Sequence, residues 1–243
     1  MRLVFETMGT VASVDVPDGF SADVDGVREI FTAADQRFSL YKPESELSRI
    51  ASGALTLAQS SSAVRESYER SIQWRIQTAG LFSPNRPDGV IDLNGIVKAE
   101  AIERAGALLD GAGCPRWTIN VGGDILVRTP DAPWRTGIAD PADDQALICS
   151  VSLVGSRRAV ATSGSAQRGD HIWRGGELAP TQFVQVSVIA GDIVTADVLA
   201  TAIVAGGQDA LDHVTDHWPV DVLAIDRSGA MLATPGFRDA MAA

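Results

Sequence analysis

The middle third of the chain is a nearly unbroken series of strand-like segments. Runs rich in valine, isoleucine, threonine and tryptophan occupy residues 117–122, 124–129, 134–139, 146–154 and 158–164. Helical segments do not alternate with these runs, as they do in chains that form parallel sheets. The pattern therefore predicts antiparallel strands, and it excludes a regular alternation of strand and helix.

Segments on both sides of this region complete an α+β pattern. Apolar residues at helical spacing predict helices over 21–37 and 60–79, and over 195–206 and 207–217 near the end. Residues 90–113 read as a short strand, a turn and a helix that ends at Gly111 or Gly113. Further strands are expected over 2–16, broken by a glycine–threonine turn, and over 183–190, 220–226 and 230–234; a loop at 38–50 leads into a short helix. We expect one domain, residues 1–243, with mixed, largely antiparallel sheets and packed helices.

Composition narrows the class of protein. The chain has 243 residues, 45% of them hydrophobic and 21% charged, which is typical of a globular protein with a sizeable core. A net charge of −11 argues against a nucleic-acid partner, because such proteins carry basic surfaces. No apolar run reaches the ~20 residues of a membrane span, and no leader pattern is evident at the start, so we expect a cytoplasmic protein. Two cysteines, Cys114 and Cys149, do not make a disulfide framework.

An acid and a hydroxyl interrupt the apolar segment TADVLATAIVAGG, residues 195–207. Asp197 and Thr201 are four residues apart, so on a helix their oxygens lie on one face. A carboxylate and a hydroxyl are hard oxygen ligands of the kind that Mg²⁺ prefers. The alternative is that Thr195 caps the helix and Asp197 is an acid favoured by the helix dipole in the first turn.

The segment IDLNGIVKAEAIERA, residues 91–105, is a second candidate. Asp92 is expected to end a strand, Asn94-Gly95 to form a tight turn, and a helix to begin near Ile96, with Lys98 close by. A helix entry with free backbone groups and a lysine can bind a phosphate-bearing ligand. A plain strand–turn–helix joint with an exposed lysine explains the pattern equally well.

Two glycine-containing segments and the histidines complete the candidates. INVGGDI, residues 119–125, permits close approach of a ligand, or forms a bulge or hairpin turn; it is no dinucleotide-binding fingerprint. Ser163 in AVATSG lacks the residues of a hydrolase nucleophile elbow. His213 and His217 lack the pattern of a zinc-binding helix and are expected at the surface.

Taken together, these segments resemble the ApbE family of FAD:protein FMN transferases over nearly the whole chain. The similar segments occur in the family's order: ETMGT (6–10), FSLYKPESELSRI (38–50), DLNGIVKA (92–99), INVGGDI (119–125), WRTGIADP (134–141), AVATSG (159–164), HI (171–172) and TADVLATA (195–202). The resemblance implies an ApbE-like architecture related to the T-fold. It also implies FAD as substrate, Mg²⁺ as metal, and a Mg²⁺-dependent transfer of FMN onto a threonine or serine hydroxyl of an acceptor protein, with release of AMP.

The resemblance assigns roles to residues of this chain. Metal ligands fall on Asp197, Thr201 and the main-chain oxygen of Gly95. The resemblance implies that Asp197 or His171 accepts the proton of the acceptor hydroxyl, and the sequence does not distinguish between the two. Contacts with FAD fall on Met8, Tyr41, Leu81, Phe82, Ser83, Asp92, Lys98 and His171.

The chain also departs from the family pattern. Asn94 and Ala99 replace glycines, the segment LFSPNRPDGV (81–90) differs from the family's FAD loop, and the residues after His171 lack the usual sequence. Two further functions therefore stay open: a flavin-binding protein without catalysis, and a Mg²⁺-dependent pyrophosphatase that cleaves FAD to FMN and AMP.

Overall fold

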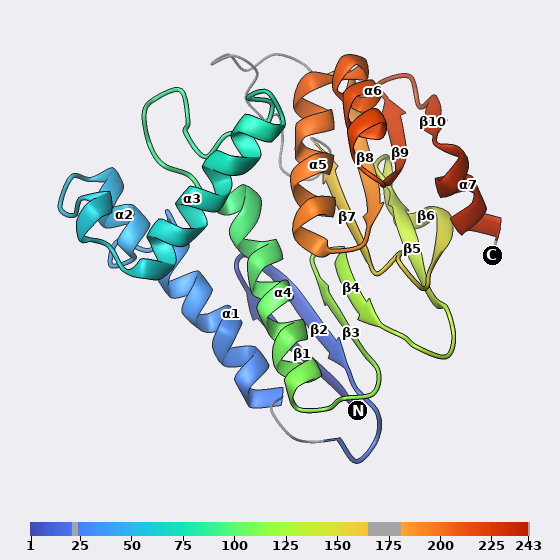
Figure 1. Cartoon of the computed structure of the whole chain (residues 1–243), viewed down its shortest axis with the longest axis horizontal. Helices are drawn as coiled ribbons and strands as arrows, with labels where there is room; N and C mark the ends of the chain where they lie inside the picture. The colour runs from blue at the N-terminus through green and yellow to red at the C-terminus, as the bar shows by residue number, and fades with distance from the viewer. Residues whose placement is uncertain (21–23, 165–180, 243) are drawn as a thin grey trace.

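A computed structural model describes residues 1–20, 24–164 and 181–242 (Figure 1). Its centre is an eight-stranded sheet with the strand order β1-β2-β3-β4-β7-β8-β9-β10, and neighbouring strands are paired antiparallel. β5 and β6 form a separate antiparallel pair. The strands are β1 (Arg2–Thr7), β2 (Thr10–Asp15), β3 (Trp117–Val121), β4 (Asp124–Arg128), β5 (Trp134–Asp140), β6 (Asp143–Leu153), β7 (Ala159–Gly164), β8 (Phe183–Ala190), β9 (Asp221–Asp226) and β10 (Met231–Ala233).

Helices cover one face of the sheet. Figure 1 shows α1, α4 and α5 lying across it, and the buried residues between these helices and the strands form the larger core. The helices are α1 (Val24–Phe38), α2 (Glu46–Ala51), α3 (Ser62–Gln77), α4 (Asn94–Gly111), α5 (Ile193–Gly206), α6 (Gln208–His217) and α7 (Pro235–Ala242), with a short 3₁₀ turn η1 (Leu57–Gln59).

The other face is covered over part of its width. The β5–β6 pair and α7 pack there on β4, β7, β8 and β9, and they form a second core around Val151, Leu153 and Phe237. β8 is consequently buried on both faces, which explains why its sequence FVQVSVIA does not alternate between apolar and polar residues.

α5 is the most enclosed helix among the described residues. It packs on β7 and β8 and also contacts α4 and α6, and most of its side chains are buried. A helix that is apolar on all sides belongs in such a position. Asp197 therefore lies in the interior, and a carboxylate there requires an explanation.

Most of the expected elements are present, but two helix starts differ from the prediction. Residues 90–92 form no strand beyond an isolated bridge between Asn85 and Ile91. The tight turn predicted at Asn94-Gly95 is wrong, because α4 begins at Asn94, and Asp92 Oδ1 accepts a hydrogen bond from the Asn94 amide at 2.9 Å. The carboxylate satisfies an amide that the helix itself leaves without a partner.

The start of α5 also differs. The helix begins at Ile193, and its cap is Asp192, whose carboxylate accepts hydrogen bonds from the amide and the hydroxyl of Thr195, both at 2.8 Å. The proposed Thr195 cap is therefore wrong. η1 and α7 were not expected from the sequence. No helix in the described ranges combines the length and the apolar character that crossing a bilayer demands.

Candidate functional site

Several turns meet at one end of the large sheet. The β1–β2 turn contains Met8 at φ 48° and Gly9 at φ 72°, and the β3–β4 turn contains Gly122 at φ 61° and Gly123 at φ 96°. A Cβ atom on Gly122 would lie 2.7 Å from Thr10 Oγ1, so the two turns approach closely only because this residue is glycine. The antiparallel register places the start of β4 and the end of β7 at the same end.

A buried ion pair joins α4 to this end of the sheet. Lys98 Nζ on α4 contacts Asp124 Oδ2 on β4, with the side chains 17% and 1% exposed. Asp124 Oδ1 accepts a hydrogen bond from the Thr162 amide of β7 at 3.2 Å. One carboxylate thus fixes a lysine and the end of a neighbouring strand.

Ser163, the residue after Thr162 on β7, contacts α5. Ser163 Oγ lies 3.0 Å from Thr201 Oγ1, a hydrogen bond in which either hydroxyl can donate. Asp197, one turn earlier on α5, is 4% exposed. It is the fifth residue of the helix, beyond the first turn, so the dipole does not explain its position. The structure therefore brings Asp197, Thr201 and Ser163 together with the Lys98–Asp124 pair through adjacent residues of β7.

Ser163 was not among the predicted ligands. A period-two pattern places Thr162 and Ser163 on opposite faces of β7, and the predicted helix 195–206 had to pack somewhere on that sheet. Those signals suggested a partner, but nothing local showed which helix would meet which strand.

The loop before α4 contributes the next predicted residues. Phe82 is 4% exposed, and its ring closely approaches Gly95: a Cβ atom on Gly95 would lie 3.0 Å from Phe82 Cε2. Leu81 reaches α5, where a Cβ atom on Gly206 would lie 2.9 Å from Leu81 Cδ2. Ser83 is exposed, and its hydroxyl accepts a hydrogen bond from the Asn85 amide at 3.2 Å. Leu81 and Phe82 thus connect the start of α4 with the end of α5.

The remaining predicted residues are distributed differently. Met8 lies in the β1–β2 turn, partly buried against the main core. Tyr41, in the segment between α1 and α2, exposes 91% of its surface. His171 lies outside the described residues. Ala99 is fully buried in the core, so the methyl group that replaces the family's glycine is enclosed by protein.

The donor set fits a hard divalent cation. Asp197 offers carboxylate oxygens, Thr201 and Ser163 offer hydroxyls, and Mg²⁺ takes such ligands together with water and phosphate oxygens. Gly95 lies within the first turn of α4, so its carbonyl is part of the helix and not of a preceding turn. Within residues 1–20, 24–164 and 181–242, no three His, Cys, Asp or Glu side chains gather to form a metal site of their own. A cation here would therefore depend on hydroxyl, main-chain or ligand oxygens as well.

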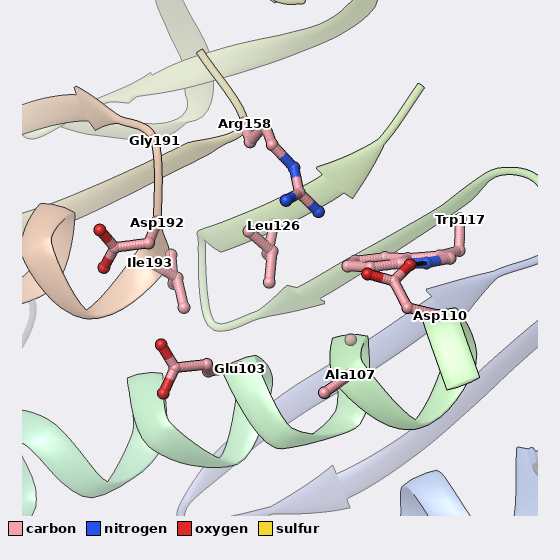
Figure 2. Close-up of a pocket in the computed structure, with 10 residues that line it drawn as sticks. Glu103, Ala107, Asp110, Trp117, Leu126, Arg158, Gly191, Asp192 and Ile193 are labelled. Atoms are coloured by element: carbon pink, nitrogen blue, oxygen red, sulfur yellow. Dashed lines mark hydrogen bonds between the residues drawn. The ribbon is translucent and has the colours of Figure 1, made fainter. Parts of the chain in front are cut away.

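A separate pocket lies along the second half of α4 (Figure 2). It encloses about 210 Å³ between α4, β3, β4 and the residues that lead into α5. Trp117 lines it, and its indole donates a hydrogen bond to Asp110 Oδ1 at 2.8 Å. Figure 2 shows the Arg158 guanidinium on the opposite side from α4. The pocket contains none of the predicted site residues; its lining is Glu103, Gly106, Ala107, Asp110, Trp117, Leu126, Arg158, Gly191, Asp192 and Ile193.

Fold and site together define a class of α+β proteins in which two packed helices meet one end of an antiparallel sheet and bring a lysine, buried carboxylates and hydroxyls together. The model of the ApbE family matches residues 83–224, a region that contains α4, α5 and the intervening strands. The chain belongs to the ApbE family.

Curated relatives are named FAD:protein FMN transferase. The one from Vibrio cholerae serotype O1 is 27% identical over 157 residues, covering 59% of this chain and 47% of the relative. The one from Klebsiella pneumoniae is 25% identical over 168 residues, covering 63% of this chain and 48% of the relative. The matches thus span about half the length of these relatives.

Solved structures show the same fold. The ApbE protein of Thermotoga maritima superimposes with a TM-score of 0.82 at 20% identity, covering 99% of each chain. The flavin transferase ApbE of Vibrio cholerae gives a TM-score of 0.78 at 20% identity, covering 98% of each chain. The expected α+β architecture of the ApbE type is confirmed.

Proposed function

We propose that this protein is a Mg²⁺-dependent FAD:protein FMN transferase. The observation that carries the proposal is the continuous contact from Lys98 through Asp124 and β7 to Thr201, beside the buried Asp197. This arrangement offers a cation for an anionic ligand and oxygen donors for a metal at one end of the sheet. The names of the curated relatives support the same activity.

Asp197 and Thr201 would hold Mg²⁺, with Ser163 and the Gly95 carbonyl as further donors. When bound, the metal supplies charge neutralisation for the diphosphate and for the departing phosphate. Lys98 would bind the ligand near its phosphates or flavin, since its ammonium is held in place by Asp124. Met8, Tyr41, Asp92 and the loop residues 81–83 remain proposed contacts of FAD.

The reaction exchanges one phosphorus–oxygen bond for another. The acceptor hydroxyl oxygen forms a bond with the phosphorus that carries the riboflavin group, and the bond from that phosphorus to the bridging oxygen breaks. AMP leaves with the bridging oxygen, and FMN stays attached to the protein as a phosphodiester. The hydroxyl proton passes to a base, for which Asp197 and His171 are the candidates.

Two other outcomes follow from the same site. If water replaces the acceptor hydroxyl, the products are FMN and AMP, and the protein acts as a pyrophosphatase. If the altered loop at 81–90 prevents turnover, the protein binds FAD without cleaving it. An acceptor protein with a threonine or serine target, and a cytoplasmic location, are parts of the proposal that rest on the sequence.

The test is AMP release from FAD, measured by chromatography with and without Mg²⁺, in the presence and absence of acceptor candidates. We expect AMP only with Mg²⁺, and a mass increase on an acceptor separates transfer from hydrolysis. Asp197→Asn should abolish AMP release. Asp216→Asn, an exposed position on α6, is the matched control and should keep it. Bound FAD without AMP would indicate a flavin-binding protein, and no FAD binding at all would refute the proposed site.

A further inference from the structure

We infer that Asp124 is a positioning residue for FAD, and that it acts on the ligand through Lys98. This inference rests on the proposed function, and it assigns a role to a residue to which the family resemblance assigns none.

The first argument is the environment of Asp124. The residue has 0% relative exposure, a position that a carboxylate occupies only when its charge is compensated. The Lys98 ammonium provides that compensation at Oδ2, and the Thr162 amide donates to Oδ1. Asp124 itself is thus enclosed by protein and contacts ligand only through another residue.

The second argument is the geometry of the lysine. A lysine side chain is flexible and loses considerable rotamer freedom when it binds a ligand. The side chain of Lys98 is 17% exposed, and Asp124 fixes its ammonium. An ammonium is a compact charge with three donors, and its contact with Asp124 fixes where that charge lies. A lysine held in this way has already lost the freedom that ligand binding would otherwise remove.

The third argument is that Asp124 touches both halves of the site at different atoms. Its Oδ2 contacts the ammonium of Lys98 on α4, whereas its Oδ1 accepts a hydrogen bond from the Thr162 amide. The next residue, Ser163, is hydrogen-bonded to Thr201 of α5. Asp124→Asn keeps a carbonyl oxygen for the Thr162 amide and removes the charge that holds Lys98. This variant therefore disturbs the lysine and preserves the anchor of β7.

The experiment is a double-mutant cycle on FAD affinity, followed by flavin fluorescence with saturating Mg²⁺. Lys98→Gln and Asp124→Asn should each weaken FAD binding by about tenfold or more, the value of a charge-assisted hydrogen bond. The double variant should bind FAD as Lys98→Gln does, because Asp124 has no effect once its lysine is gone.

A second readout separates positioning from general damage. In AMP release, Asp124→Asn should raise KM for FAD while the Mg²⁺ concentration for half-maximal rate stays unchanged. A loosened fold would move both quantities. The matched control is Arg128→Gln, because the Arg128–Asp110 pair at 2.9 Å joins the same two elements, α4 and β4, away from the site. It should leave FAD affinity unchanged.

The outcomes are distinct. Unchanged or tighter FAD binding by Asp124→Asn overturns the inference, as does a double variant whose loss is the product of the two single losses. If Asp124→Asn fails to fold, the double variant still tests the route through Lys98, because it leaves no buried charge without its partner: FAD binding weaker than that of Lys98→Gln overturns the inference. A wild-type protein that binds no FAD refutes the proposed function itself, whereas wild-type binding with an inert Asp124 refutes only its positioning role.

Discussion

Gly106 on α4 is a position where packing should outweigh helix propensity. A Cβ atom built there would lie 2.5 Å from Trp117 Cη2, 3.1 Å from Trp117 Cζ2 and 3.2 Å from Leu126 Cδ2. Trp117 is 2% exposed and its indole is hydrogen-bonded to Asp110, so displacing the ring breaks that bond. We therefore predict that Gly106→Ala destabilises the protein, although alanine is the better helix former.

The magnitude follows from three contributions. Alanine in a helix interior gains about 1 kcal/mol over glycine. Overpacking a filled core costs about 1–3 kcal/mol, and a displaced indole would lose a hydrogen bond to a carboxylate worth about 1.5–3 kcal/mol. The net loss is about 1.5–5 kcal/mol, which corresponds to a fall in Tm of about 3–20 °C for a chain of this length.

The assay is urea and thermal unfolding followed by circular dichroism, with Gly111→Ala as control. Gly111 lies on the same helix, and a Cβ atom there meets no heavy atom within 4 Å. The control should be as stable as wild type, or more stable by up to about 1 kcal/mol. If Gly106→Ala unfolds at the same urea concentration as Gly111→Ala, the argument from close packing against Trp117 is refuted.

Three further predictions concern the site and ionisation. Thr201→Val loses the hydrogen bond with Ser163 and a proposed metal ligand, so AMP release should need at least about tenfold more Mg²⁺ while stability falls by only about 1 kcal/mol; an unchanged Mg²⁺ requirement would contradict the assigned role. Burial acts to raise the pKa of Glu46, but an amide before α3 and a guanidinium on α1 outweigh it, and the pKa is lowered. Glu46 therefore stabilises the fold above its unfolded pKa, and the advantage of wild type over Glu46→Gln in urea unfolding at pH 7 should disappear as the pH falls through the folded pKa; a constant difference would refute this. Burial raises the pKa of Cys114 and of Cys149, so iodoacetamide at pH 8 should react slowly with the native protein and rapidly in urea, as mass spectrometry would show; equal rates would contradict it.

The order of the elements could be predicted because it depends on local pattern. The hairpin at the start, the strands from 117 to 164 and the helix that contains Asp197 all occur where periodicity indicated them. The helix starts were less predictable. Asp192 caps α5 from outside the apolar segment, and Asp92 accepts a hydrogen bond from the first amide of α4 in place of a turn, because such bonds depend on which side chain bends back to the amides.

The candidate site likewise has one part that the sequence predicts and another that it does not. The shared face of Asp197 and Thr201 follows from the helical period alone, and no tertiary contact is required to predict it. The partners of these residues could not be derived, because Ser163 meets Thr201, and Asp124 meets Thr162, each across 38 residues of chain. Contacts at that distance depend on which strands pair and on how the helices pack over them, and local spacing carries no information about either. The sequence by itself determined which helix face carries the oxygen ligands, and the tertiary structure decided which strand would meet that face and which lysine would pair with Asp124.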